Sequence, residues 1–216
     1  DDRFLRLIRK FLNAGYMEEW QFNKTYSGTP QGGIISPILA NIYLDKFDKY
    51  MDEYANKFNK GTARSRNKDI CKLNSRVHYL KRRINEVEDV NVRTRMVEEL
   101  HEKQKLILTM PSGNDMDVNF RRLKYVRYAD DFLIGVIGTK NECETIKADI
   151  TKFMQEKLRL EMSQEKTLIT NAQDSAKFLG YEIYVRKDYA TKRNSNGTVR
   201  RYFNGNVILH VSREVI

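Results

Sequence analysis

Two adjacent carboxylates stand between two apolar runs in the stretch Tyr125-Val-Arg-Tyr-Ala-Asp-Asp-Phe-Leu-Ile134. Aspartate is a poor strand residue and neighbouring carboxylates repel each other, so the pair is costly unless a cation compensates it. Magnesium is the natural candidate, because this hard ion takes carboxylate oxygens together with substrate phosphates. The pattern therefore predicts a β-hairpin that presents Asp130 and Asp131 as metal ligands at its tip. The alternative is a type I′ turn with two exposed acids.

Positive charge gathers in two stretches of a chain whose net charge is +10. Residues 57–84 contain ten lysines and arginines against Asp69 alone, and residues 186–201 contain six against Asp188. Such segregation favours a phosphate backbone as the partner, because binding to it releases counterions. A single basic run is explained about as well by a solvated helix face. The presence of two such clusters favours nucleic acid as the partner.

Composition narrows the class of protein further. The 216 residues are 40% hydrophobic, which suits a folded domain, and no apolar run approaches the roughly 18 residues of a membrane span. We expect no membrane partner. Cys71 and Cys143 stand far apart without nearby histidines, so we expect neither a disulfide nor a zinc site. A reducing compartment such as the cytoplasm is the expected location.

Hydrophobic spacing predicts the elements that position the acidic pair. Helices are expected over 4–12, from Ser36-Pro37 to residue 58, and as a hairpin over 67–109 with a break at 90–92. A further helix is expected to begin at Asn141, with Glu144 as its capping-box partner. Strands are expected on both sides of the acidic pair and at 166–170, 177–185 and 198–211. This order predicts an α+β domain with a charged helical insertion.

Four strings in the sequence carry a family resemblance. Residues 28–48 read Gly-Thr-Pro-Gln-Gly-Gly-Ile-Ile-Ser-Pro-Ile-Leu-Ala-Asn-Ile-Tyr-Leu-Asp-Lys-Phe-Asp, and Tyr128-Ala-Asp-Asp131 follows them. Ser163-Gln-Glu-Lys-Thr167 and Phe178-Leu-Gly-Tyr181 come later. In this order the strings resemble the motifs of group II intron-encoded reverse transcriptases, also known as maturases. Each string alone would be a much weaker signal.

The resemblance implies a fold and a division of the chain. The fold would be α+β, with a right-hand polymerase palm-type antiparallel sheet packed by helices. Residues 1–216 would form a partial reverse transcriptase domain of palm and finger-side elements, with a basic helical insertion at 57–124 and a β-hairpin leading toward the thumb at 186–216. Members of the family use a third aspartate on a strand before the first helix of this chain. Because Asp1 and Asp2 begin that helix, the chain alone is expected to be inactive.

Roles for single residues also follow from the resemblance. Asp130 and Asp131 would hold two Mg²⁺ ions, with Asp130 as the direct ligand. Gln31, Gly32 and Lys166 would bind the incoming nucleotide, and Leu179 and Gly180 would grip the primer. From the residues alone, the glycines are equally turn formers, Lys166 a surface lysine at a strand start, and Leu179-Gly180 a tight turn.

The implied function is that of an RNA-directed DNA polymerase in a group II intron maturase, which also binds intron RNA to assist splicing. Its partners would be the intron RNA template, a DNA primer and dNTPs, and a homodimer through the insertion is possible. Its location would be the cytoplasm of a bacterium. The alternative is a non-catalytic RNA-binding splicing cofactor. Tyr79 could stack on bases or belong to the core. The residues expected to bind RNA are Lys57, Arg64, Arg66, Lys68, Lys72, Arg76, Lys81, Arg82 and Arg83.

Overall fold

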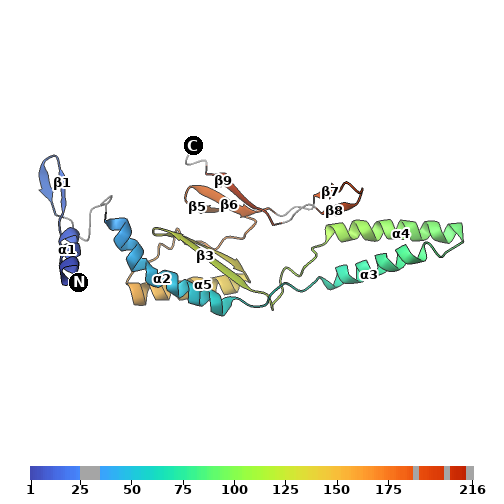
Figure 1. Ribbon diagram of the computed structural model, residues 1–216, viewed down its shortest axis with the longest axis horizontal. Coiled ribbons are helices and arrows are strands. Elements are labelled where there is room, and N and C mark those ends of the chain that lie inside the picture. Colours follow the sequence, from blue (N-terminus) through green and yellow to red (C-terminus); the bar gives the residue numbers. More distant parts are fainter. Residues whose placement is uncertain (25–34, 187–189, 202–204, 213–216) are drawn as a thin grey trace. The chain divides into compact units, whose positions relative to one another are not determined.

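The computed structural model describes residues 1–24, 35–186, 190–201 and 205–212 (Figure 1). The chain divides into two units. The first contains residues 1–54 and 125–132, and the second contains residues 55–124 and 133–216.

The first unit opens with a short amphipathic helix and a hairpin. Helix α1 (Asp2–Leu12) confirms the helix predicted over 4–12 but begins two residues earlier, and the Asp1 side chain caps it by accepting a hydrogen bond from the Arg3 amide. Strands β1 (Tyr16–Glu18) and β2 (Gln21–Asn23) pair antiparallel. This hairpin was not predicted, because its two-residue turn lacks the Gly or Asn that usually marks one.

Helix α2 (Ser36–Phe58) supplies the buried face of the first unit. Leu44, Phe47 and Met51 are buried and recur at three and four residues, which places them on one side of the helix. The predicted helix is confirmed, but it starts one residue earlier than expected. The carbonyl of Ile35, not that of Ser36, accepts the first helical hydrogen bond, from the Leu39 amide.

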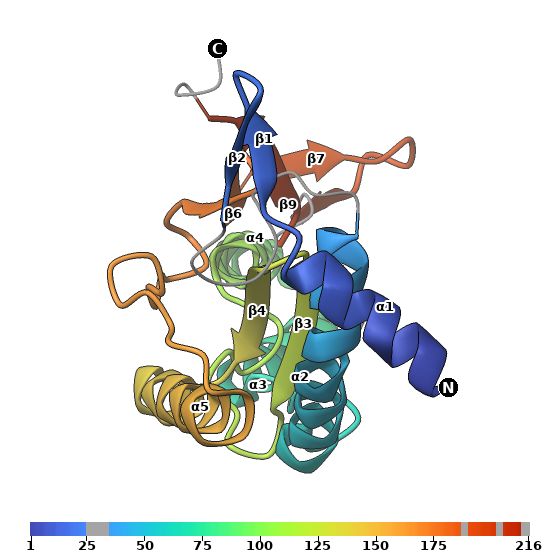
Figure 2. The ribbon, with the colours of Figure 1, turned by 90° about the vertical axis from the view of Figure 1, so that its left-hand side faces the viewer.

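Strands β3 (Arg122–Tyr128) and β4 (Asp131–Ile137) form the hairpin predicted around the acidic pair (Figure 2). The loop between them contains two residues, Ala129 and Asp130. The strands are joined to α2 by aromatic contacts. The Phe47 ring meets the rings of Tyr125 and Phe132 edge-on, each with a centroid separation of 5.3 Å.

A helical hairpin of α3 (Lys68–Arg83) and α4 (Val90–Thr109) lies within the second unit (Figure 1). The break between the helices falls at 84–89 rather than at 90–92. Asp89 sets this boundary, because its side chain accepts from the Asn91 and Val92 amides and so caps α4. The side chain of Asn67 caps α3 in the same way, by accepting from the Asp69 amide.

The two segments that connect to this helical hairpin are bonded to each other. We refer to these segments, residues 59–65 and 113–123, as the neck. Lys60 and Arg121 exchange two backbone hydrogen bonds of 3.0 Å, as in an antiparallel ladder. The Arg122 guanidinium adds bonds to the carbonyls of Lys60 and Gly61, at 2.8 and 2.6 Å. The helical hairpin is therefore closed at its base.

A buried acid strengthens the neck. Asp117 is 7% exposed and accepts hydrogen bonds from the amides of Ser65 and Asn119. These amide donors, Ser65 first, hold the pKa of the Asp117 carboxyl below its usual range. Gly61 has a φ of +74°, and a Cβ there would stand 2.3 Å from the Asn119 carbonyl oxygen. A side chain at position 61 is therefore excluded by both conformation and space.

Helix α5 (Lys140–Phe153) follows β4 and continues into one π-helical turn, η1 (Met154–Leu158). Its capping box lies two residues before the predicted one, and joins Thr139 to Glu142 rather than Asn141 to Glu144. Glu142 also receives the guanidinium of Arg121, at 2.8 Å. This second partner favours Glu142 over Glu144, which is exposed to solvent. The buried residues of this segment are Ile146, Ile150, Met154 and Leu158.

The prediction of a strand at 166–170 is wrong, because these residues are all described and form no strand. Ser163 instead organises a local turn. Its carbonyl accepts from the Thr167 amide at 3.0 Å and from the Thr167 hydroxyl at 2.7 Å. These short-range bonds compete with a strand, which is the usual effect of Ser and Thr beside a turn.

The remaining strands belong to two small sheets. Strands β5 (Ala176–Phe178), β6 (Tyr181–Val185) and β9 (Val207–Val211) form an antiparallel sheet in the order β5-β6-β9. Strands β7 (Thr191–Arg193) and β8 (Val199–Arg201) pair with each other. The α+β class with small antiparallel sheets is confirmed. Within the described ranges, no helix combines the length and apolar character that crossing a membrane requires.

Candidate functional site

Asp130 and Asp131 lie at the tip of the β3–β4 hairpin, and both are exposed. Asp130 is the second loop residue and Asp131 is the first residue of β4. Of the two loop residues only Ala129 has a positive φ, of +53°. A type I′ turn requires a positive φ at both positions, so the tip is a hairpin turn of another type, with two exposed acids.

A network of ion pairs and hydrogen bonds centred on Arg127 contacts this tip. The Arg127 guanidinium binds both oxygens of Asp48, with Nε to Oδ1 at 2.8 Å and Nη2 to Oδ2 at 2.6 Å. Its Nη1 donates to the Asn41 side-chain oxygen at 3.0 Å and to the Ala129 carbonyl at 2.6 Å. The Tyr125 hydroxyl donates to Asp48 at 2.8 Å. Both α2 residues, seven positions apart, lie on one side of that helix.

Burial and charge make this network a fixed one. The Arg127 side chain is only 10% exposed. Its hydrogen bonds hold the pKa of the Asp48 carboxyl below its usual range, so the pair is fully ionised near neutral pH. Burial, followed by the bond to Asp48, raises the pKa of the Tyr125 hydroxyl, which therefore remains a proton donor.

The network was missed from the sequence, although a signal for it exists. Along β3 the residues Leu123, Tyr125 and Arg127 alternate with exposed neighbours and so share the covered face. A cation on such a face needs an anionic partner. The partner could not be identified from the sequence, because Asp48 is 79 positions away from Arg127 and looks like any acid on a charged helix.

The chemistry of the tip fits a hard divalent cation, since it offers carboxylate oxygens and is open to solvent. The number of donors is small, however. Among the described residues no group of three or more His, Cys, Asp or Glu side chains is arranged to hold a metal ion. A metal ion held at this tip would therefore need further ligands, from substrate or from other acidic residues.

The other expected nucleotide contacts lie apart in the sequence. Gln31 and Gly32 lie outside the described residues. Lys166 is exposed, and its amide donates to the Ser163 hydroxyl in the turn that replaces the expected strand. Lys166 belongs to the second unit, and Asp130 belongs to the first.

Leu179 and Gly180 form the two-residue turn between β5 and β6, with φ values of +52° and +78°. Both signs fit a type I′ turn, for which Asn-Gly is the favoured pair. A leucine in this conformation costs about 1–2 kcal/mol, and Leu179 is nevertheless 43% exposed.

The nine cations expected to bind RNA fall into two groups. Four have acidic partners: Arg64 with Asp115, Arg76 with Glu99, and both Arg82 and Arg83 with Glu86. The other five are exposed and have no ion pair within the described ranges, namely Lys57, Arg66, Lys68, Lys72 and Lys81. Arg76 binds both Glu99 oxygens at 2.8 Å and so ties α3 to α4.

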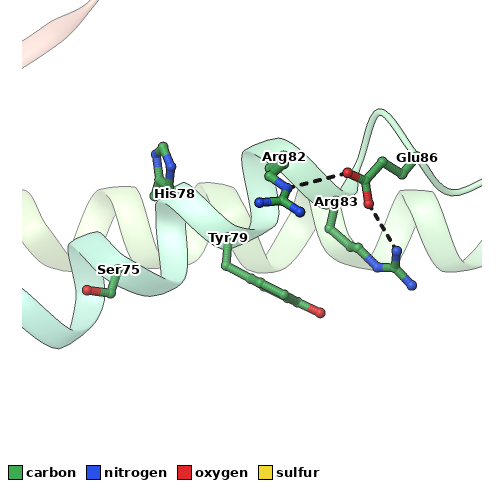
Figure 3. A pocket seen from close by; sticks show the side chains of 6 residues that line it. All are labelled: Ser75, His78, Tyr79, Arg82, Arg83 and Glu86. Atoms are coloured by element: carbon green, nitrogen blue, oxygen red, sulfur yellow. Dashed lines mark hydrogen bonds and ion pairs between the residues drawn. The ribbon is translucent and has the colours of Figure 1, made fainter.

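One face of α3 combines several of these cations with an aromatic ring. We refer to Lys68, Lys72, Ser75, Tyr79, Arg82 and Arg83 as the basic stripe, because they recur at three and four residues. Figure 3 shows its distal half around a shallow hollow, where Glu86 lies between Arg82 and Arg83. Tyr79 is 50% exposed, so it is not a core residue, and the Arg76 guanidinium stands 5.2 Å from its ring centroid.

Comparison with known proteins places these features in a family. Residues 92–183 match the family model described as reverse transcriptase (RNA-dependent DNA polymerase). The chain is 42% identical over 209 residues to the group II intron-encoded protein LtrA of Lactococcus lactis subsp. cremoris, a match that covers 97% of this chain and 34% of that protein.

Proteins of a yeast and a plant are also similar. The putative COX1/OXI3 intron 1 protein of Saccharomyces cerevisiae is 38% identical over 206 residues, covering 93% of this chain and 23% of that protein. Nuclear intron maturase 2, mitochondrial, of Arabidopsis thaliana is 27% identical over 161 residues, covering 74% and 18%. The chain thus spans about a third or less of the length of these relatives. It belongs to the family of group II intron-encoded reverse transcriptases and maturases.

Proposed function

We propose that the protein is an RNA-directed DNA polymerase that adds nucleotides at the tip of the β3–β4 hairpin. The observation that carries this proposal is the pair of exposed carboxylates, Asp130 and Asp131, at a tip fixed by buried charge. The antiparallel strands around the tip would then form part of a polymerase palm.

Nucleotide addition is a phosphoryl transfer in which positioning and charge stabilisation do most of the work. Two bound Mg²⁺ ions would supply charge stabilisation for the attacking and leaving oxygens. The role of this chain is to hold Asp130 and Asp131 rigidly at a solvent-open position where a triphosphate can enter. Because two carboxylates supply few of the oxygen ligands that Mg²⁺ takes, substrate phosphates and a further acidic residue would complete the site. We expect the 216-residue chain alone to be inactive.

The incoming dNTP and the primer would be held by other parts of the chain. Gln31 and Gly32 would line the nucleotide pocket, and the exposed Lys166 would neutralise triphosphate charge. Leu179 and Gly180 would contact the primer strand. The support for this last role is the strained and exposed leucine of the turn.

Replacing Leu179 with asparagine should change stability and function in opposite directions. Asparagine adopts a positive φ more readily than leucine, so the free energy of unfolding should rise by about 0.5–1 kcal/mol. The KM for the primer should rise by roughly 10-fold, because the apolar contact, worth about 1–2 kcal/mol, is lost. Thermal melting and steady-state primer extension measure the two effects. A more stable protein with an unchanged primer KM would contradict a primer contact at Leu179.

The helical hairpin of α3 and α4 has a separate proposed role, as an insertion that binds structured intron RNA and so assists splicing. The basic stripe supports this role, because it joins unpaired lysines to an exposed tyrosine on one helix face. A non-catalytic splicing cofactor is the second candidate function, since the stripe alone would suffice for it. A homodimer through this hairpin and a bacterial cytoplasmic location stay predictions.

Primer extension on an RNA template separates the two candidates. The full-length protein should extend a DNA primer in the presence of Mg²⁺ and dNTPs, and the Asp130→Ala variant should not. Extension that survives the substitution would refute the polymerase proposal at this site. Lost extension with retained splicing would show that both roles exist and use different surfaces.

A further inference from the structure

The peptide group that precedes Asp130 is held by a side chain rather than by the strand ladder. Its oxygen, the Ala129 carbonyl, accepts a hydrogen bond of 2.6 Å from Nη1 of Arg127. This oxygen belongs to the peptide plane between Ala129 and Asp130. Fixing the oxygen therefore fixes the plane from which the Asp130 side chain projects.

Arg127 is itself fixed by a fork of acceptors on one helix. Both oxygens of Asp48 and the side-chain oxygen of Asn41 engage three of its N–H groups, and the Ala129 carbonyl takes a fourth. Four of the five guanidinium donors are thus used. Lysine cannot reproduce this arrangement, because it has a single charged nitrogen and no planar fork.

We propose that Arg127 is a positioning residue for the metal-binding tip and that the fork of Asp48 and Asn41 on α2 sets the orientation of Asp130. The proposal rests on the proposed function of Asp130 as a metal ligand. The Arg127 guanidinium is engaged by Asp48, Asn41 and the Ala129 carbonyl, and it acts through the Ala129 peptide. A carboxylate on a two-residue loop with no such anchor would sample several orientations, which weakens metal binding and catalysis.

The Arg127→Lys variant of the full-length protein tests this role. The kcat for primer extension should fall by at least about 10²-fold, as for a misplacement of roughly 1 Å, whereas KM for dNTP and primer should change by less than about 3-fold. The Mn²⁺ concentration that half-saturates the protein, followed by electron paramagnetic resonance of the free ion, should rise. Amide hydrogen exchange at residues 129–131 should accelerate at least 10-fold.

Arg121→Lys is the matched control. Arg121 also binds one carboxylate, that of Glu142, and its side chain is 11% exposed against 10% for Arg127. The control should lose a similar amount of thermal stability while leaving Mn²⁺ binding and exchange at 129–131 unchanged. Should Arg127→Lys fail to fold, Asn41→Ala provides the second variant, because it removes one exposed acceptor and should give an intermediate loss of kcat.

The outcomes separate this inference from the proposed function. If Arg127→Lys and Arg121→Lys behave alike in kcat, Mn²⁺ binding and exchange, the guanidinium is merely structural and the inference is overturned. If Asp130→Ala retains extension, the proposed function fails instead. The exchange measurement still reports on the tip in that case, because it depends on no metal and no activity.

Discussion

Replacing Asp130 with asparagine should lower the kcat of primer extension by at least about 10³-fold. Asparagine keeps the size and the loop conformation of aspartate but removes the charge that a hard cation requires. Stabilisation by a bound metal ion is worth several kcal/mol, and each 1.36 kcal/mol is about 10-fold in rate. Steady-state extension of a DNA primer on an RNA template, at saturating Mg²⁺, measures the loss.

Two further variants make this prediction specific. Asp131→Asn should cost at least about 10-fold less than Asp130→Asn, because in the family resemblance the first aspartate is the direct ligand. Asp45→Asn should have no effect, since Asp45 is an exposed acid on α2 whose partner is Lys49. Equal losses at Asp130 and Asp45 would mean that net charge, rather than the hairpin tip, governs the rate.

Removing the helical hairpin should separate RNA binding from polymerisation. Lys60 and Arg121 form the hydrogen-bonded backbone pair that flanks a two-residue turn in a β-hairpin. Residues 61–120 can therefore be replaced by Asn-Gly, which closes the neck with a type I′ turn. The affinity for a structured group II intron RNA should fall by at least about 10²-fold, because the basic stripe is lost. Filter binding at several salt concentrations measures the affinity and its salt slope.

The shortened protein should keep its other properties. Extension on a short unstructured template should stay within about 3-fold of the wild-type rate, because the metal-binding tip and its Arg127 support are untouched. The salt slope for intron RNA should become shallower by about 3, at roughly 0.7–0.9 for each of four lost phosphate contacts. Unchanged affinity and an unchanged salt slope would show that the RNA binds elsewhere than on α3.

Point substitutions refine the same test without a deletion. Glutamate at Lys68, Lys72 and Arg82 reverses three charges of the basic stripe and should weaken RNA binding strongly. The control is glutamate at Arg93, Arg95 and Lys105, three exposed cations on α4 that lie outside the stripe. The same number of charges changes sign in both variants. Equal losses would indicate nonspecific attraction to net charge, not a binding face on α3.

The acidic hairpin and the long helices could be predicted because their signals are local. Apolar residues at helical spacing define α2, and the apolar runs on both sides of Asp130 define β3 and β4. Element ends were less accurate. Glu142 rather than Glu144 forms the capping box of α5, because Glu142 also binds Arg121. The position of Arg121 relative to this cap could not be predicted from the sequence.

The long-range parts of the site could not be predicted for a similar reason. Arg127 was visible as a cation on the covered face of a strand, but its partners Asp48 and Asn41 stand 79 and 86 positions away. The neck joins Lys60 to Arg121 through backbone atoms, which carry no sequence signal. The prediction of a strand at 166–170 failed because the hydroxyl and carbonyl of Ser163 accept hydrogen bonds from Lys166 and Thr167 and so form a turn.

Because hydrogen bonds of its own backbone close the neck, changes in the length of α3 and α4 need not disturb β3, the strand that follows the neck. Inserting seven residues, close to two turns, into each of α3 and α4 would carry their far end about 10.5 Å outward with nearly the same helix faces in contact. The length of the helical hairpin can therefore change without altering the residues at its base. Strands β3 and β4 would keep their alignment, since Arg121 and Arg122 anchor the start of β3 whatever the length of the hairpin.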